Sequence, residues 1–218
     1  MEADNNSNEP HFLLLGKTGV GKSTISKILS ENKSIIIGDS FTPQTKKSNS
    51  YECKIAGFKF QLIDTPGYDQ DKQNDNEHFE DIKRMLSSDN YNIKGIFLVF
   101  SFQDVRFSDS HRQGFEKIVN LVPLDDFWKY FGIIFTKTYK DPGDDDDDLE
   151  DIKKEKLEKL KEIFQPLIKA YKKVKNIKEV DFSIIKKVFV NLNKKKTKKT
   201  DEQLKELLNV FSTIIQNY

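Results

Sequence analysis

One segment constrains the fold of this chain more than any other: Gly16–Ser23, which has the sequence GKTGVGKS. It matches the pattern G-x-x-x-x-G-K-[ST], and a chance match in a chain of this length is on the order of one in a hundred at average residue usage. An apolar run, Phe12–Leu15, precedes it, and Ile25, Ile28 and Leu29 after it are spaced as one face of a helix. A strand, a glycine-rich turn and a helix in this order predict a loop that cradles phosphate groups.

Each residue type in this loop has a chemical reason to be there. Glycines let the backbone curl until successive N–H groups face one anion. We expect Lys22 to reach the β- and γ-phosphates of a nucleotide, Ser23 to hold Mg²⁺ through its hydroxyl, and Thr24 to contact the α-phosphate. The candidate nucleotide-binding residues of the loop are Gly16, Lys17, Thr18, Gly19, Val20, Gly21, Lys22, Ser23 and Thr24.

The rest of the chain alternates short apolar strands with amphipathic helices. Residues 51–55 and 58–64 flank Ala56-Gly57 and predict an antiparallel hairpin. Pro166 is expected to kink or break the helix that contains it. The pattern predicts an α/β fold of the P-loop NTPase class, with a mostly parallel six-stranded sheet, one antiparallel edge hairpin and helices on both faces. The other strands are expected at 12–15, 93–102, 130–138 and 186–193, and the helices at 22–32, through Phe79 to Leu86, at 108–122, at 149–174 and through Leu204 to Ile215.

Length and composition limit the remaining possibilities. The 218 residues suit a single domain over residues 11–218, behind a flexible polar N-terminus, residues 1–10. The 36 basic and 35 acidic residues nearly cancel, so charge gives no case for binding nucleic acid. One cysteine, Cys53, excludes an internal disulfide framework and favours a reducing, cytoplasmic setting. The polar start is not typical of a signal peptide, and the longest apolar run is too short to span a bilayer.

A second short segment, Asp64–Gly67 (DTPG), ends the hairpin. An aspartate at a strand end near a phosphate loop can bind Mg²⁺ through water. The Gly67 N–H can sense a γ-phosphate, and the chain after it can then change conformation. The antiparallel hairpin fits a GTPase sheet better than the all-parallel sheet of small-molecule kinases. The three arginines of the chain, Arg84, Arg106 and Arg112, are few for the arginine-rich lid of a nucleotide kinase.

Together these segments resemble the AIG-type G domain, the family of the GTPases of immunity-associated proteins, which is similar to septins and chloroplast import GTPases. The resemblance covers roughly residues 11–195 and is carried by GKTGVGKST, a threonine-bearing loop, DTPG, GIFLVFSFQDVRFSDSHRQGFEKI, IIFTKT and VFVNLN. It implies a guanine nucleotide-binding domain with GTP or GDP as ligand and Mg²⁺ as cofactor. It also implies pairing of two copies across the nucleotide face, as a homodimer.

The resemblance extends to residues around the γ-phosphate. By spacing from Asp64 the switch threonine corresponds to Thr45, with Thr42 as the alternative. The implied metal ligands are then Ser23, Thr45 and Asp64. Tyr68 stands where Ras-like enzymes have a water-orienting glutamine, so we expect it to pack on the core and intrinsic hydrolysis to be slow. The candidate catalytic residues are Lys22, Thr45, Gly67 and Arg106.

Arg106 lies just beyond the strand at 93–102, at an edge of the sheet shared with the phosphate loop. In a dimer it could reach the partner's γ-phosphate and neutralise the charge that develops there. The alternative is a structural arginine that caps a helix or pairs with Asp104 or Asp109.

The residues expected to recognise the base match the family pattern less closely. Thr136 and Lys137 match the start of a TKxD box, in which the lysine stem packs on the purine, and Asn191 matches the asparagine that meets the base. Tyr139 occupies the position of the aspartate that reads guanine. Asp141 or the aspartates after it could substitute if the loop folds back, so guanine remains the expected base.

Two charge runs follow the last two sheet strands, Asp144–Asp148 and the lysines of residues 194–199. We interpret them as solvated loops, the alternative being mutual attraction across an interface on the base side.

Three functions fit these observations: a GTP-hydrolysing switch, a GTP-dependent assembly scaffold without appreciable turnover, and an ATP-handling P-loop enzyme. A peripheral membrane or effector partner would be compatible with any of them, and the sequence does not identify one.

Overall fold

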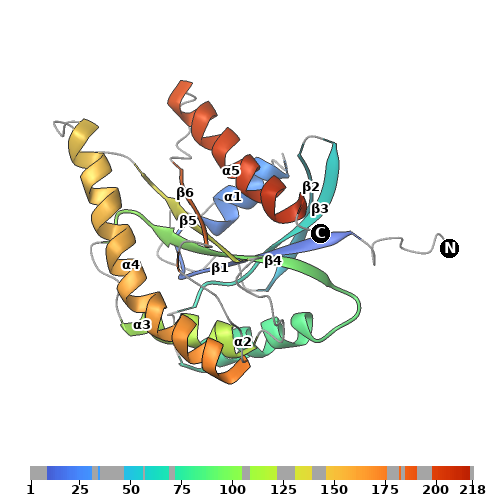
Figure 1. Ribbon diagram of the computed structural model, residues 1–218. Coiled ribbons are helices and arrows are strands. Elements are labelled where there is room, and N and C mark those ends of the chain that lie inside the picture. Colours follow the sequence, from blue (N-terminus) through green and yellow to red (C-terminus); the bar gives the residue numbers. More distant parts are fainter. Residues whose placement is uncertain are drawn as a thin grey trace.

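The computed structural model of the chain describes residues 9–30, 34, 47–55, 57–68, 72–104, 109–121, 131–138, 146–175, 182, 185–190 and 198–216. A twisted sheet runs through the centre of the molecule, with helices on both sides of it (Figure 1). The elements in chain order are β1 (Pro10–Leu15), α1 (Lys22–Leu29), β2 (Asn49–Ile55), β3 (Phe58–Asp64), α2 (Lys72–Leu86), β4 (Asn92–Ser101), α3 (Asp109–Leu121), β5 (Phe131–Thr136), α4 (Asp146–Lys175), β6 (Lys186–Phe189) and α5 (Lys198–Gln216).

The six strands lie in the order β2-β3-β1-β4-β5-β6. β2 pairs antiparallel with β3, while every other pair, from β3–β1 to β5–β6, is parallel. The predicted mixed sheet with one antiparallel edge hairpin is therefore confirmed. From β1 the chain builds the sheet in both directions, so the end of β1 is the point where the strand order reverses. Ligands of open α/β sheets bind at such a point, beside the carboxyl ends of the strands.

Successive side chains of β1 point to opposite faces of the sheet, as in any strand, and so belong to two separate hydrophobic cores. Phe12 and Leu14 pack with α1 and α5, whereas Leu13 and Leu15 pack with α2, α3 and α4. All four side chains are buried. The helices thus cover both faces, as the sequence predicted. Figure 1 shows α1 and α5 above the sheet and α2 and α3 below it.

Aromatic rings anchor α5 to its face of the sheet. Phe211 stacks on Phe97 of β4 with ring centroids 4.1 Å apart, and it also contacts Phe12 and Phe60 of the neighbouring strands. Cys53 of β2 lies buried in the same core, and burial raises the pKa of its thiol to about 12. A thiol held protonated in this way packs as a small apolar side chain and is a poor nucleophile.

The longest helix differs from the prediction. α4 starts at Asp146 instead of residue 149 and continues through Pro166 to Lys175, so of the two expected effects of the proline, a kink or a break, the break does not occur. Proline removes one backbone hydrogen bond from a helix. Pro166 itself is exposed, while Phe164 and Ile168 on either side of it are fully buried. Packing on both sides of the proline therefore holds the helix together across it.

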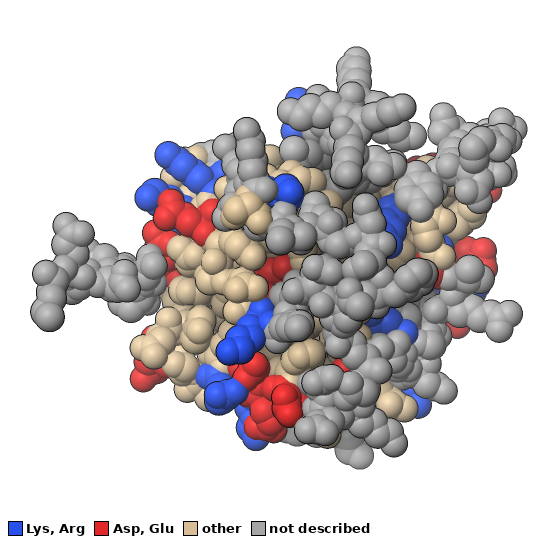
Figure 2. All heavy atoms as spheres, turned by 180° about the vertical axis from the view of Figure 1, so that it is seen from behind, with Lys and Arg blue, Asp and Glu red and all other residues tan. Residues whose placement is uncertain are grey.

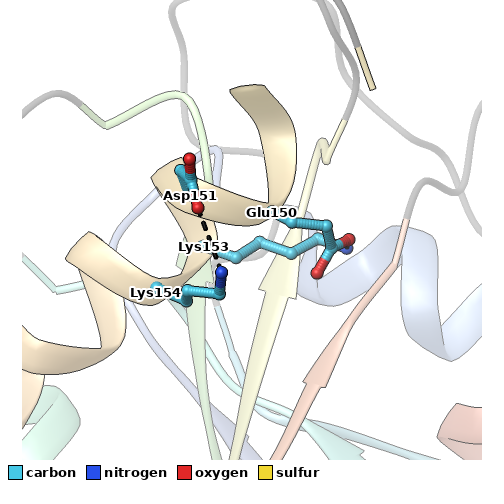
Figure 3. A network of polar contacts seen from close by, with 4 residues as sticks. All are labelled: Glu150, Asp151, Lys153 and Lys154. Carbon is cyan, nitrogen blue, oxygen red and sulfur yellow. Dashed lines mark hydrogen bonds and ion pairs between the residues drawn. The ribbon is translucent and has the colours of Figure 1, made fainter. Parts of the chain in front are cut away.

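Part of the acidic run belongs to this helix and is not loop. Asp146–Asp148 form its first turn, where negative charge is favourable beside the helix dipole. In the following turn Lys153 pairs with Glu150 at 2.6 Å and Lys154 pairs with Asp151 at 3.0 Å (Figure 3). Glu150 and Asp151, which follow the acidic run, are thus paired with lysines of their own helix.

On the face seen in Figure 2, basic and acidic side chains lie interspersed among neutral ones. The remainder of the acidic run and Lys194–Lys196 lie outside the described residues. None of the described helices combines the length and the apolar character needed to cross a membrane.

Candidate nucleotide-binding site

The phosphate loop joins the end of β1 to the start of α1, at the point where the strand order reverses. Gly19 and Gly21 have φ angles of 78° and 100°, in the left-handed region that favours glycine. A Cβ on Gly16 would lie 2.4 Å from the carbonyl oxygen of Val99. α1 starts at the N-cap residue Gly21 without a side-chain cap hydrogen bond. An uncapped helix N-terminus behind a glycine-rich loop is suited to binding phosphate.

Lys22 places a cation on this loop. Its ammonium group donates to the carbonyl oxygens of Gly16, at 2.9 Å, and Lys17, at 2.8 Å. The side chain is buried, and burial lowers the lysine pKa to about 8, against the opposing effect of the Asp64 carboxylate. Positive charge and backbone N–H groups therefore meet where the sequence predicted the phosphates.

Ser23 and Asp64 form a compact oxygen pair beside the loop. The Ser23 hydroxyl donates to Oδ2 of Asp64 at 2.6 Å, and Asp64 is buried at the end of β3. Hydroxyl and carboxylate oxygens are ligands that Mg²⁺ accepts, usually together with water and substrate phosphates. Within the described ranges no three His, Cys, Asp or Glu side chains gather as a metal-binding group. These two residues thus fit a magnesium ion of the nucleotide-linked kind, whose third implied ligand, Thr45, lies outside the described residues.

The DTPG segment packs directly against the phosphate loop. The Thr18 N–H donates to the Tyr68 carbonyl at 3.3 Å, and the Tyr68 N–H donates to the Gly16 carbonyl at 3.4 Å. A Cβ on Gly67 would lie 2.4 Å from the backbone nitrogen of Thr18. The close contact requires glycine at position 67, and it brings the Gly67 backbone beside the loop, as the γ-phosphate hypothesis needs.

Tyr68 is a packing residue, as expected. Its ring is buried and stacks on Phe79 of α2, with centroids 6.3 Å apart. A Cβ on Gly114 of α3 would come within 2.9 Å of the tyrosine ring. The chain after DTPG is thus attached to α2 and α3 by its side chain and to the phosphate loop by its backbone. A side chain enclosed in this way is not placed to orient an attacking water.

The residues that the sequence assigns to the base lie where β4, β5 and β6 end, and this region is called the base side below. The Thr136 hydroxyl is buried, donates to the carbonyl of Val20 in the phosphate loop and lies 3.1 Å from the carbonyl of Phe100. The Thr136 carbonyl accepts from the Phe102 N–H at 2.8 Å. Thr136 therefore connects the base loop to the phosphate loop, and its hydroxyl is engaged with backbone.

Lys137 is exposed and has a φ of 55°, the one positive value among the described residues that are not glycine. Its carbonyl accepts a hydrogen bond from the side-chain amide of Gln103 at 2.9 Å. Val190, the last residue before Asn191, accepts from the Thr138 N–H at 3.4 Å, which places that strand end beside the base loop. Asn191 itself lies outside the described residues, as do Tyr139, Arg106 and the alternative switch threonine, Thr42.

Sequence reasoning missed two contacts that position the site. The Thr65 hydroxyl donates to the carbonyl of Leu14 at 2.7 Å and so attaches DTPG to β1. Gln103 contacts Lys137 from 34 positions away in the chain. A threonine next to Asp64 at the end of a strand could have suggested the first contact, but no local pattern marks the second.

Comparison with known proteins agrees with this geometry. "GTP-binding protein A" of Dictyostelium discoideum is 33% identical over 108 residues, which are 48% of this chain and 23% of that protein. The chain therefore spans about a quarter of this relative. Toc33 from Arabidopsis thaliana, in complex with Mg²⁺ and GMPPNP, superposes with a TM-score of 0.74 at 18% identity, over 96% of this chain and 85% of that one.

A structure of the chloroplast translocon components atToc33 and psToc159, for whose GTPase activity dimerization is described as important, gives a TM-score of 0.71 at 20% identity. It covers 93% of this chain and 83% of that one. At such identities the likeness supports the fold alone. The model of the AIG1 family matches residues 11–218, nearly the whole chain, and the protein therefore belongs to the AIG1 family.

Proposed function

We propose that this protein binds GTP and GDP with Mg²⁺ and hydrolyses GTP slowly, as a switch that pairs with a second copy across its nucleotide face. The observation that carries the proposal is the attachment of DTPG to the phosphate loop through Tyr68 and Gly67. A nucleotide-dependent switch needs such a connection between the phosphates and a segment able to respond to them. Membership of the AIG1 family supports the same function.

In the proposed complex the loop backbone and the first turn of α1 bind the phosphates. Lys22 contributes the positive charge, and burial strengthens its attraction to an anion. Ser23, Asp64 and Thr45 would hold Mg²⁺, which supplies charge neutralisation between the phosphate groups. The Gly67 N–H would report whether a γ-phosphate is present.

Slow turnover follows from the surroundings of Tyr68. Its enclosed ring supplies no amide to orient water, so catalysis by one copy would depend on the loop and the metal alone. The same observation favours a second candidate, a GTP-dependent scaffold with negligible turnover. Phosphate release at saturating GTP separates the two, because a scaffold would release none above the Lys22→Ala background at any protein concentration.

Guanine is the proposed base. Lys137 would pack its stem on the purine, and Asn191 would read the polar edge in place of the aspartate that Tyr139 replaces. Identification of the nucleotide that copurifies with the protein, followed by competition between GTP and ATP, tests this directly. ATP binding as tight as GTP binding would replace the guanine proposal with an ATP-handling enzyme.

Pairing supplies the missing catalytic group in this proposal. Arg106 would reach the partner's γ-phosphate, and an arginine provided in trans is worth about 10³–10⁵ in rate. Specific activity should then rise with protein concentration, and Arg106→Ala should abolish the rise while GTP affinity stays near the wild-type value. Arg112→Ala is the matched control, because Arg112 is exposed and pairs with Glu116 on its own helix, 3.6 Å away. Activity per molecule that is flat across the monomer–dimer range would contradict the trans arginine.

A further inference from the structure

We propose that Gln103 is a positioning residue for nucleotide selectivity, because its side chain holds Lys137 in the backbone conformation that presents the lysine to the purine. The inference rests on the proposed function, in which Lys137 contacts the base. Gln103 follows β4, whereas Lys137 follows β5, and Gln103 belongs to neither of the base-binding segments that the sequence suggested.

The first argument is the conformation of Lys137 itself. A φ of 55° is unfavourable for a residue with a Cβ, and such residues persist only where their surroundings fix them. The flanking groups are fixed here. The Thr136 carbonyl accepts from the Phe102 N–H at 2.8 Å, and the Thr138 N–H donates to the Val190 carbonyl at 3.4 Å.

Between these two backbone contacts stands the Lys137 carbonyl, which accepts from the amide nitrogen of Gln103 at 2.9 Å. This bond comes from a side chain, so it is the one member of the set that mutation can remove. Rotation of the Lys137 peptide toward a right-handed conformation would break it. Gln103 therefore favours the left-handed state over the alternatives.

The second argument is that Gln103 is itself held. It lies in a turn closed by a hydrogen bond from the Asp104 N–H to the Ser101 carbonyl, at 3.1 Å. Lys156 of α4 donates to the Asp104 carbonyl at 2.7 Å and lies over the ring of Phe102 at 5.1 Å. A long, exposed side chain gains little from a hydrogen bond when its backbone is mobile, but this backbone is fixed from two elements.

The chemistry of the contact allows a near-isosteric test. Gln103→Glu keeps the shape but replaces the amide donor with a carboxylate, which only accepts and would face the Lys137 carbonyl oxygen. We expect this variant to lower GDP affinity about fivefold to tenfold, which is the range expected for the loss of one hydrogen bond to an exposed carbonyl. The GDP/ADP affinity ratio should fall as well. Gln103→Arg, which restores a donor, should recover most of the ratio. Gln113→Ala, at an exposed glutamine of α3, should bind both nucleotides as the wild type does.

A double-mutant cycle separates positioning from a general structural effect. In a Lys137→Ala background Gln103→Glu should cause no further loss of GDP affinity, because the side chain that it positions is gone. If the losses of GDP affinity from the two substitutions added in full, the inference would be overturned. The same holds if Gln103→Glu bound GDP and ADP like the wild type while Lys137→Ala was impaired. Neither result would contradict the proposed function. If the wild-type protein bound no guanine nucleotide, the proposed function would fail, and this inference with it.

Discussion

The phosphate side and the base side of the site are built by different means. On the phosphate side one continuous loop supplies backbone groups, and its glycines are required by left-handed φ angles at Gly19 and Gly21 and by the contact of Gly16 with Val99. On the base side three strand ends meet, and side chains such as Thr136 and Gln103 make the connections. A site made of backbone restricts its residues to glycine, whereas a site made of side chains can exchange one donor for another.

This difference explains why the sequence pattern is strict at Gly16–Ser23 and loose around Tyr139. It also gives an order of sensitivity to mutation. Changes on the phosphate side, or to Thr136, which connects the two sides, should affect every nucleotide. Changes to the other base-side residues should alter the choice among nucleotides. The predictions below test that division, starting with the largest expected effect.

Lys22→Ala should abolish tight binding of all nucleotides, with a loss of at least about a hundredfold in affinity, because a buried charge contact to phosphate is removed. Titration with fluorescent GDP and ADP measures both losses. Lys27→Ala, later on α1, is the matched control and should bind as the wild type does. Unchanged GDP affinity in a folded Lys22→Ala protein would remove the phosphate-loop assignment.

Gly67→Ala should weaken binding of a non-hydrolysable GTP analogue by about tenfold more than binding of GDP. The added methyl group would lie 2.4 Å from the backbone nitrogen of Thr18, and such overpacking typically costs about 1–3 kcal/mol. The chain at DTPG would then move away from the loop. Calorimetric titration with the two ligands gives the ratio, and equal losses for both would mean that Gly67 does not sense the third phosphate.

Thr136→Val tests whether the two sides are coupled. It keeps the shape of the side chain but removes the hydroxyl that contacts Val20 and Phe100, leaving buried carbonyls without this donor. The free energy of unfolding should fall by about 1–3 kcal/mol, and GDP and ADP affinities should fall together. Denaturant unfolding of Thr136→Val and Thr136→Ser measures the first effect, and the serine variant should be nearly unaffected. A selective loss of GDP would assign Thr136 to the base instead.

Asn191→Ala and Tyr139→Asp should cause the smallest changes in absolute affinity, a few-fold, and should move the GTP/ATP ratio in opposite directions. The first removes a group that reads the base, and the second restores a carboxylate able to accept from guanine. Competition assays at fixed Mg²⁺ report the ratio. Equal shifts for both nucleotides would place these residues outside base recognition.

The sequence was sufficient for the sheet, the hairpin and the phosphate loop, because their signals are local. Apolar runs end in glycines or turns, and the phosphate loop has the fixed residue pattern G-x-x-x-x-G-K-[ST]. It was insufficient for α4 at Pro166, since the burial of Phe164 and Ile168 that holds the helix together is a tertiary effect. It was also insufficient for the roles of Thr136 and Gln103, whose partners are set by which strands lie side by side.

The attachment of α5 also has a consequence for how the molecule is made. Phe211 completes a core with Phe12 of the first strand, so this contact joins the first and last described elements of the chain. Contacts so distant in sequence close late and slow folding. During synthesis, at about 5–20 residues per second, the face of the sheet that carries Phe12, Phe60 and Phe97 has only α1 to cover it until residues 198–216 have left the ribosome. The emerging chain therefore exposes aromatic surface to chaperones and to aggregation for longer than its finished fold would suggest.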